Sequence, residues 1–353
     1  MKTIHYIFLF VSLSFFAQAQ TIRRVTNDPN IPLGLNMYST LQAAHDAATE
    51  GDIIYVQSSY QGASYGDLTS SKRLHIIGNG YGIDENKDLL GANAPYNTGT
   101  SIVGNVNLNF GDGTIIEGLK IEYMYARTRV ILRRCDFYFL ELLKISVNQD
   151  PSSSIISHSN IFGLSLKNNS GITTLNNITI ANNIIRGVIS GQYENESAIS
   201  NIFIRNNYLF SGLSYMTNIQ LHSNILHFTN SYGDNLYYTP RCPNKVGSNN
   251  VCIDKPCDVG SNNVNGPLDI ALFGYANGGV PSIPRHHILS NSSPAKGAGL
   301  GGVDAGPFGT ADPFRLSGLP AIPQITSYSS QISNSIYTPS TPMNVTISVR
   351  GNN

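Results

Sequence analysis

The sequence has 353 residues, of which 22 are basic and 22 acidic, and only 12% are charged while 41% are hydrophobic. This low charge excludes coiled coils and helical bundles, which are rich in Glu and Lys, and the apolar content excludes a disordered chain. A formal net charge of zero argues against a nucleic-acid partner held through phosphate contacts. The 38 asparagines predict a fold with many turns, because Asn is unfavourable inside helices and tolerates left-handed backbone.

The first 19 residues have the features of a secretory signal peptide. Lys2 provides a basic start, an apolar run follows over residues 7–16, and Ala17-Gln18-Ala19 has the small-x-small pattern of a signal peptidase site. We therefore expect a mature chain that starts at Gln20 and is secreted, either extracellular or at the cell surface. No later apolar stretch reaches the ~18 residues that a membrane-spanning helix needs.

After this segment the chain predicts one short helix and then strands. Residues 39–50 have alanines at helical spacing, with Ser39 as the expected N-cap and Gly51 as the stop. Residues 52–56 and 68–78 contain short apolar runs that are typical of strands. Residues 79–100 are rich in Gly, Asn and Asp, which indicates an inserted loop.

Between about residues 100 and 230 the chain repeats itself. Five segments align without gaps and begin with Ile, at successive spacings of 24, 23, 24 and 17 residues: 131–136, 155–160, 178–183, 202–207 and 219–224. A period of this size with strand-like alternation indicates a solenoid. The segments have no Leu-x-x-Leu-x-Leu frame, so a parallel β-helix fits better than a leucine-rich repeat.

In a β-helix, equivalent residues of successive coils stack on one another. The last position of each repeat would then form a hydrogen-bonded ladder at one turn. The expected members are Asp136, Asn160, Asn183, Asn207 and Asn224.

The C-terminal third shows weaker order. Two copies of Gly-Ser-Asn-Asn-Val, at 247–251 and 260–264, indicate irregular last coils. We expect the β-helix to occupy residues 20–310. Residues 311–353 are rich in Pro, Ser and Thr and would form a tail or a pair of capping strands.

The four cysteines consist of Cys135 alone and a cluster of Cys242, Cys252 and Cys257. Secretion permits disulfides, so we expect one local bridge, joining Cys242 with Cys252 or Cys257. Cys135 would be a small buried apolar residue. A zinc site in the cluster would need a fourth ligand at a recognisable spacing, which the neighbouring sequence does not supply.

Both ends of the expected solenoid resemble the secreted right-handed parallel β-helix proteins of the pectin-lyase-like superfamily. The resemblance rests on Leu41-Gln-Ala-Ala, Gly51-Asp-Ile-Ile-Tyr-Val, Leu74-His-Ile-Ile-Gly, Ser293-Pro-Ala-Lys-Gly-Ala-Gly and Asp304-Ala-Gly-Pro-Phe, and it spans roughly residues 38–310. It implies an all-β fold with a short N-terminal helix that caps the solenoid. It implies no single activity, because the superfamily contains lyases, hydrolases, epimerases and adhesins.

The known catalytic patterns of such proteins are mostly missing. The sequence has no Asp-Asp, Gly-His-Gly or Arg-x-Lys, which argues against a polygalacturonase-like hydrolase, and carboxylates are sparse in the repeats. Residues 84–88 begin like a calcium loop but lack its Gly and Glu, so calcium stays an open alternative to no cofactor. The His286-His287 pair would bind a metal only with ligands from elsewhere.

The repeat alignment predicts one binding surface. If the first Ile of each repeat points inward, the fourth and second positions point outward. This places Arg134, His158, Arg205 and His222 in a row, with Phe203 and Ile156 beside it. Arg could bind a carboxylate or sulfate group, and Phe203 could stack on a sugar ring.

We therefore expect a secreted, non-catalytic protein that binds an acidic polysaccharide or a component of the cell envelope. The alternatives are a polysaccharide lyase, in which Arg134 or Arg205 would act as the base, and a self-associating surface protein with Phe203 and Ile156 in the contact.

Overall fold

The computed structural model describes residues 20–83, 99–171, 173–193, 195–227, 242–253, 256–257, 259–267, 269–273, 287–320, 323–330 and 345–350. The expected signal peptide and the greater part of the expected inserted loop lie outside these residues. Within them, no helix is long and apolar enough to cross a membrane.

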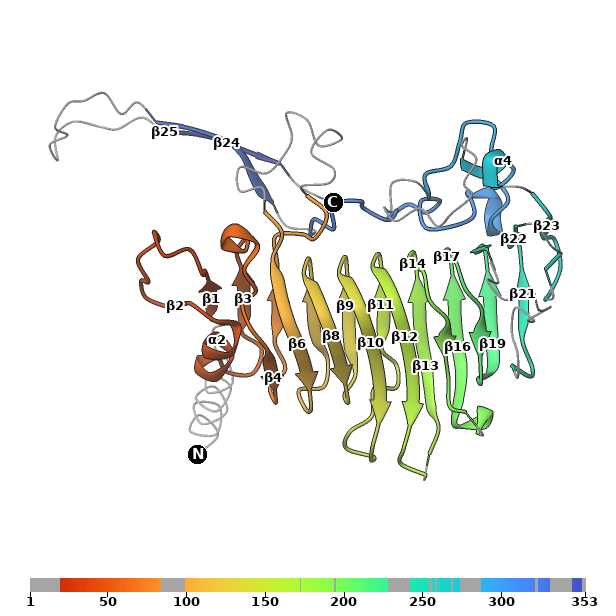
Figure 1. Ribbon diagram of the computed structural model, residues 1–353, viewed down its shortest axis with the longest axis horizontal. Helices are drawn as coiled ribbons and strands as arrows, with labels where there is room; N and C mark the ends of the chain where they lie inside the picture. The colour runs from red at the N-terminus through yellow and green to blue at the C-terminus, as the bar shows by residue number, and fades with distance from the viewer. Residues whose placement is uncertain are drawn as a thin grey trace, which may run out of the picture.

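Two long parallel sheets dominate the structure (Figure 1). In spatial order, the first sheet contains β2 (Met37–Tyr38), β1 (Ile22–Val25), β3 (Ile53–Val56), β5 (His75–Ile77), β7 (Thr114–Glu117), β9 (Val130–Arg133), β11 (Ile155–Ser157), β13 (Leu175–Ala181), β16 (Ile199–Arg205), β19 (Thr217–His222) and β21 (Val246–Ser248).

The second sheet runs in the opposite chain order. It contains β23 (Val264–Asn265), β22 (Val251–Cys252), β20 (Ile225–Leu226), β17 (Tyr208–Leu209), β14 (Ile184–Ile185), β12 (Asn160–Asn168), β10 (Asp136–Lys144), β8 (Lys120–Ala126), β6 (Ile102–Leu108) and β4 (Leu68–Ser70), with β15 (Ile189–Ser190) and β18 (Leu213–Ser214) alongside.

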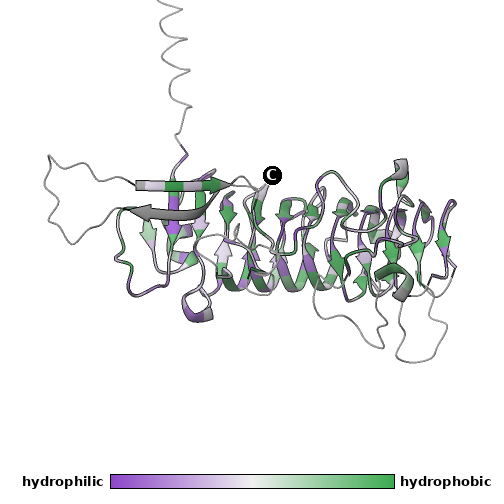
Figure 2. Ribbon diagram, turned by 90° about the horizontal axis from the view of Figure 1, so that it is seen from above, coloured by the Kyte–Doolittle hydropathy of each residue, from purple (hydrophilic) through white to green (hydrophobic). Residues whose placement is uncertain are grey.

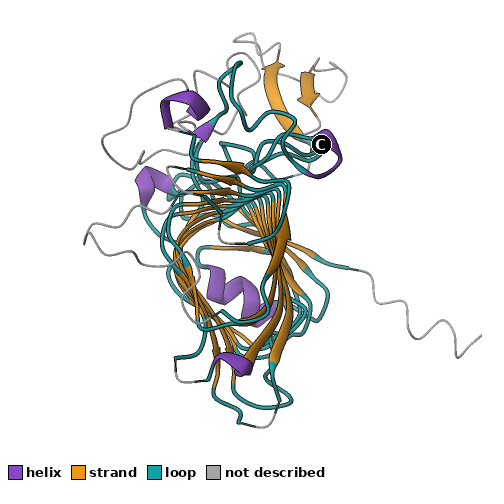
Figure 3. Ribbon diagram, turned by 90° about the vertical axis from the view of Figure 1, so that its right-hand side faces the viewer, coloured by secondary structure: helices purple, strands orange, loops and turns teal. Residues whose placement is uncertain are grey.

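The chain alternates between these sheets, so each coil of roughly two dozen residues adds a strand to each. The expectation of parallel strands in a repeating arrangement is thus confirmed, and the arrangement is consistent with a β-helix. Viewed along the stack, the strands of each sheet line up behind one another (Figure 3). Figure 2 shows hydrophobic and hydrophilic residues alternating along the strands. The inward apolar side chains form one continuous core that follows the stack.

The predicted helix is present but shorter than expected. Helix α2 spans Leu41–Ala47, and its N-cap is Thr40 rather than Ser39, because the Thr40 hydroxyl accepts a hydrogen bond from the Ala43 amide at 3.2 Å. Leu41 and Ala44 are fully buried against the first coils. The other helical segments are short: η1 (Tyr60–Gly62), η4 (Glu196–Ala198), α4 (Asp269–Phe273) and η6 (Leu300–Gly302).

The register of the first two repeats differs from the ungapped alignment by one residue. Ile131 and Ile155 lie beside Thr179, not beside Ile178, so they point outward. Ile156 is fully buried instead of exposed. The outward column that contains Arg205 and His222 therefore passes through Arg133 and Ser157, and not through Arg134 and His158.

The same shift changes the ladder. Asn183, Asn207 and Asn224 stack as expected, but Asp136 and Asn160 begin strands of the second sheet and pair with each other. The backbone amide of each ladder residue donates to the side chain of the next residue, at 2.8–3.2 Å, in the order Cys135, Ser159, Asn183, Asn207, Asn224, Asn250 and Asn263. Asn250 and Asn263 come from the two predicted last coils.

Directly before each ladder residue, the chain adopts a left-handed conformation. Seven stacked residues share a φ between 53° and 58°: Arg134, His158, Asn182, Asn206, Ser223, Asn249 and Asn262. We call this set the left-handed column. Four of the seven are Asn, the side chain that best tolerates this backbone after Gly.

A C-terminal segment, residues 298–320, runs back along the coils toward their N-terminal end (blue in Figure 1). We call it the strap. Its contacts with the coils begin at Asn249, whose Nδ2 donates to Ala298 O, and end near Tyr81, whose amide donates to Ser317 O. The domain boundary expected at residue 310 falls inside the strap. Beyond it, β24 (Gln324–Ser330) and β25 (Val345–Arg350) form a separate antiparallel pair.

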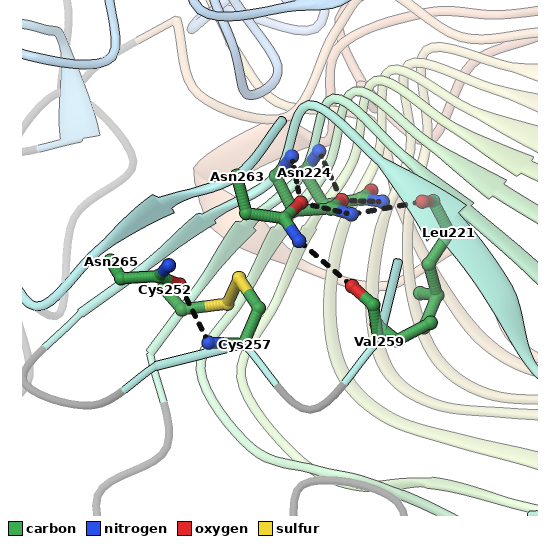
Figure 4. Close-up of a disulfide and its surroundings, with 8 residues drawn as sticks. Leu221, Asn224, Cys252, Cys257, Val259, Asn263 and Asn265 are labelled. Atoms are coloured by element: carbon green, nitrogen blue, oxygen red, sulfur yellow. Dashed lines mark hydrogen bonds between the residues drawn. A yellow bond between two sulfur atoms is a disulfide. The ribbon is translucent and has the colours of Figure 1, made fainter. Parts of the chain in front are cut away.

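The disulfide joins Cys252 to Cys257, and not either of them to Cys242. The Cys257 amide also donates to Asn265 Oδ1, so the bridge secures the coil at the end of the Asn ladder (Figure 4). Cys135 is fully buried, as expected, at the first rung of the ladder, and Cys242 is buried in the same core.

Candidate functional site

The strap is anchored on the left-handed column, and its attachments leave one coil open. It is held at Ser223, whose Oγ and O accept from Leu300 N and Gly306 N, both at 2.8 Å. Its next attachment is at Asn182, whose Nδ2 donates to Thr310 Oγ1 at 2.7 Å. The coil between these two attachments carries Asn206. A groove of about 590 Å³ opens here between the strap and the first sheet.

The floor of the groove comes from neighbouring strands β16 and β19. Arg205 pairs with His222 in one outward column, and Phe203 pairs with Gln220 in the next. Arg205 is exposed, whereas the rings of Phe203 and His222 are half-buried. His222 Nδ1 lies 3.0 Å from Ser248 Oγ, which orients its ring. The groove thus combines a cation, a titratable ring and an aromatic ring.

The strap supplies the facing wall of the groove. Its lining residues are Leu300, Val303, Thr310 and Ala311, which are apolar apart from one hydroxyl. On the coil side, Ala181 stands in the outward column where the next coil has Arg205, and its small side chain leaves room beside the guanidinium. The groove therefore presents its charge from the coils and its apolar surface from the strap.

Asn206 is the functional residue that the repeat alignment missed. It lines the groove, and its Nδ2 is buried without a hydrogen-bond acceptor among the described residues. The corresponding amide of Asn182 is bonded to the strap. A signal for this column exists in the sequence, because four Asn-Asn pairs place a left-handed residue before a ladder residue: 182–183, 206–207, 249–250 and 262–263.

Arg134 and His158 do not belong to the groove. They lie under the strap in the left-handed column, where Arg134 Nη2 donates to Asp312 Oδ1 at 3.3 Å and His158 Nε2 lies 2.8 Å from Asp312 O. Only 5% of Arg134 and 9% of His158 is exposed. Two of the four basic residues predicted to bind a ligand therefore attach the chain to itself.

A charged cluster surrounds this attachment. Burial would raise the pKa of Glu117, but His75, whose Nε2 lies 2.8 Å from Glu117 Oε1, and the nearby Arg133 hold it below its ordinary value. Burial lowers the pKa of His158, although Asp312 acts in the opposite direction. These groups are tied to one another, so they stabilise the fold at neutral pH.

The described residues that line the groove include no Asp or Glu. An acid and base pair of carboxylates, as glycosidases use, is therefore not assembled from them. Among the described residues, no group of three or more His, Cys, Asp and Glu side chains is placed to hold a metal ion. Residues 84–88 and His286 lie outside the described residues, and His287 is buried against the ring of Tyr208.

Comparisons of this chain with protein families, with curated proteins and with solved structures find no match.

Proposed function

We propose that this protein is a secreted, right-handed parallel β-helix of the pectin-lyase-like superfamily, with α2 as its N-terminal cap. The long all-parallel sheets and the repeating coils support this proposal. The sequence patterns at both ends of the coils support it further, as does a disulfide, which is typical of proteins that fold outside the reducing cytosol.

We further propose that the protein is a non-catalytic glycan-binding protein, and that the groove between strap and coils receives an acidic polysaccharide of the cell envelope or its surroundings. The observation that carries this proposal is the unpartnered Asn206 amide beside Arg205 at the one coil that the strap leaves open. A buried donor without an acceptor costs free energy, which a ligand oxygen would recover.

Each lining residue has a role that suits an acidic sugar. Arg205 offers a planar set of donors to a carboxylate or sulfate group. Phe203 offers an apolar ring to the C–H face of a sugar, and Asn206 donates to a hydroxyl or ring oxygen. Because the cation is exposed, the attraction should weaken as salt screens it.

The test is retention of the purified protein on immobilised polygalacturonate and on a neutral glucan, eluted with a salt gradient. We expect salt-dependent retention on the acidic polymer alone. The Arg205→Ala variant should lose about tenfold or more in affinity, since a hydrogen bond to a charged group contributes about 1.5–3 kcal/mol.

Arg24→Ala is the matched control. Arg24 is exposed and lies in the same outward column of the first sheet, seven strands from Arg205, or about 34 Å away at ~4.8 Å per strand. Its loss removes the same charge from the same face. Equal losses in both variants would show nonspecific charge attraction and would refute a site in the groove.

The lyase alternative has less support, because Arg205 would need carboxylates nearby to hold and polarise a uronate, and none lines the described groove. An ultraviolet band of unsaturated uronates, formed on incubation with polygalacturonate and absent with Arg205→Ala, would establish the lyase instead. The self-association alternative loses half of its expected contact, because Ile156 is buried.

A further inference from the structure

A second group of cations lies under the strap, outside the groove. Arg134 interacts electrostatically with Arg315 of the strap, and Arg133 and Arg134 both act on Glu117 and His158. Three guanidinium groups thus meet two carboxylates, those of Glu117 and Asp312. Glu117 is already engaged with His75, so the cluster carries an excess of positive charge.

The guanidinium groups also have donors to spare. Arg134 is 5% exposed, yet neither its Nε nor its Nη1 has an acceptor among the described residues. The same holds for Nε of Arg133, Nε of Arg315 and Nδ1 of His158. A buried charge with unsatisfied donors is expensive, and like charges placed together raise this cost.

The backbone at Arg134 adds an independent observation. Its φ of 53° is left-handed, in a column where Asn is the commonest residue. An Arg at this position is unfavourable for its backbone, and strain of this kind is retained where the side chain is needed. Its single contact with Asp312, at 3.3 Å, does not use the rest of the guanidinium.

We propose that Arg133, Arg134 and Arg315 form an oxyanion-binding site beneath the strap. Its ligand is a phosphate or sulfate ion, or the carboxylate or sulfate group of an acidic sugar. A planar guanidinium matches any of these oxyanions with two parallel donors. The site is independent of the groove, because its residues and those that line the groove are different.

The test measures the melting temperature in sodium sulfate and in sodium chloride at equal ionic strength. Sulfate stabilises most proteins, so the readout is the difference between variants. We expect a saturable sulfate-dependent rise of roughly 2–5 °C in the wild type. Arg134→Asn should lose the saturable part and should fold, because Asn182 and Asn206 occupy equivalent positions.

Arg129→Asn is the matched control, since Arg129 is exposed and paired with Asp112 nearby. Sulfate responses in Arg134→Asn that equal those of the wild type and of this control would overturn the proposal. Retention on a sulfated polysaccharide separates the two ligand sources: loss in Arg134→Asn indicates a sugar group, and unchanged retention with a lost sulfate response indicates a free ion. Arg205→Ala should keep the sulfate response whether or not the groove binds glycan.

Discussion

Asn183 and Asn207 are linked across one coil by a hydrogen bond from Asn183 Nδ2 to Asn207 Oδ1, at 3.0 Å, and both side chains are fully buried. The Asn183 backbone amide donates to the same oxygen at 2.8 Å. The pair is part of the ladder that satisfies the buried turn between the two sheets. Without it, each coil would leave unpaired polar groups in the core.

Replacing Asn207 with Asp should destabilise the protein strongly. Asn207 Nδ2 donates to three oxygens, including Ile180 O at 2.9 Å, and a carboxylate there would face acceptors in a buried site. We expect a loss of at least about 3 kcal/mol in the free energy of unfolding, measured with denaturant. Asn201→Asp, the same change at an exposed left-handed position, should cost below about 0.5 kcal/mol. Similar losses in both variants would show that the ladder contributes little.

Replacing Asn206 with Gly should weaken glycan binding and leave stability almost unchanged. Gly keeps the left-handed backbone and removes the amide that faces the groove. One neutral hydrogen bond is worth about 0.5–1.5 kcal/mol, so we expect affinity for polygalacturonate to fall by roughly two- to tenfold. Asn201→Gly is the control for the backbone effect. A variant that binds as tightly as wild type would remove Asn206 from the site.

Stability should fall in mild acid through His158. Burial holds its pKa below that of an unfolded His, near 6.5, so the unfolded chain binds the proton more tightly. The contribution is therefore complete above about pH 6.5 and is lost as the pH falls toward the lower folded value. We expect His158→Asn to show a shallower decline in unfolding free energy between about pH 7.5 and pH 5.5.

Glu117 and Asp52 provide the reference for that experiment. Their pKa values are lowered in the fold, so their contributions are lost below about pH 4.5, in the wild type and the variant alike. A pH dependence that is identical in the two proteins down to about pH 5.5 would show that His158 does not titrate with folding.

Thiol labelling should distinguish the cysteines. Burial raises the pKa of the Cys135 thiol to about 12, so it should not react with Ellman's reagent in the native protein near pH 8. It should react once denaturant unfolds the chain. Peptide mapping without reduction should recover Cys252 joined to Cys257. Fast labelling of Cys135 in the native state, or a bridge to Cys242, would contradict the structure.

The repeat period could be predicted from the sequence, but its register could not. Apolar residues begin all five repeats, and an outward Ile131 cannot be told from an inward Ile178 by composition. Cys135 and Ser159 stand where later coils have Asn, so the ladder is hidden in the first two repeats. The even spacing of 24 residues from Cys135 through Ser159 and Asn183 to Asn207 is the signal that restores it.

The sequence by itself determined the parallel repeating architecture, because apolar alternation and stacked Asn turns are local properties that recur in every coil. Only the tertiary structure decided which basic residues face a ligand. Arg134 and Asp312 are 178 positions apart, and no periodicity connects them. The strap buries Arg134 and His158, and its unattached span over Asn206 leaves Arg205, His222 and Phe203 to line the groove.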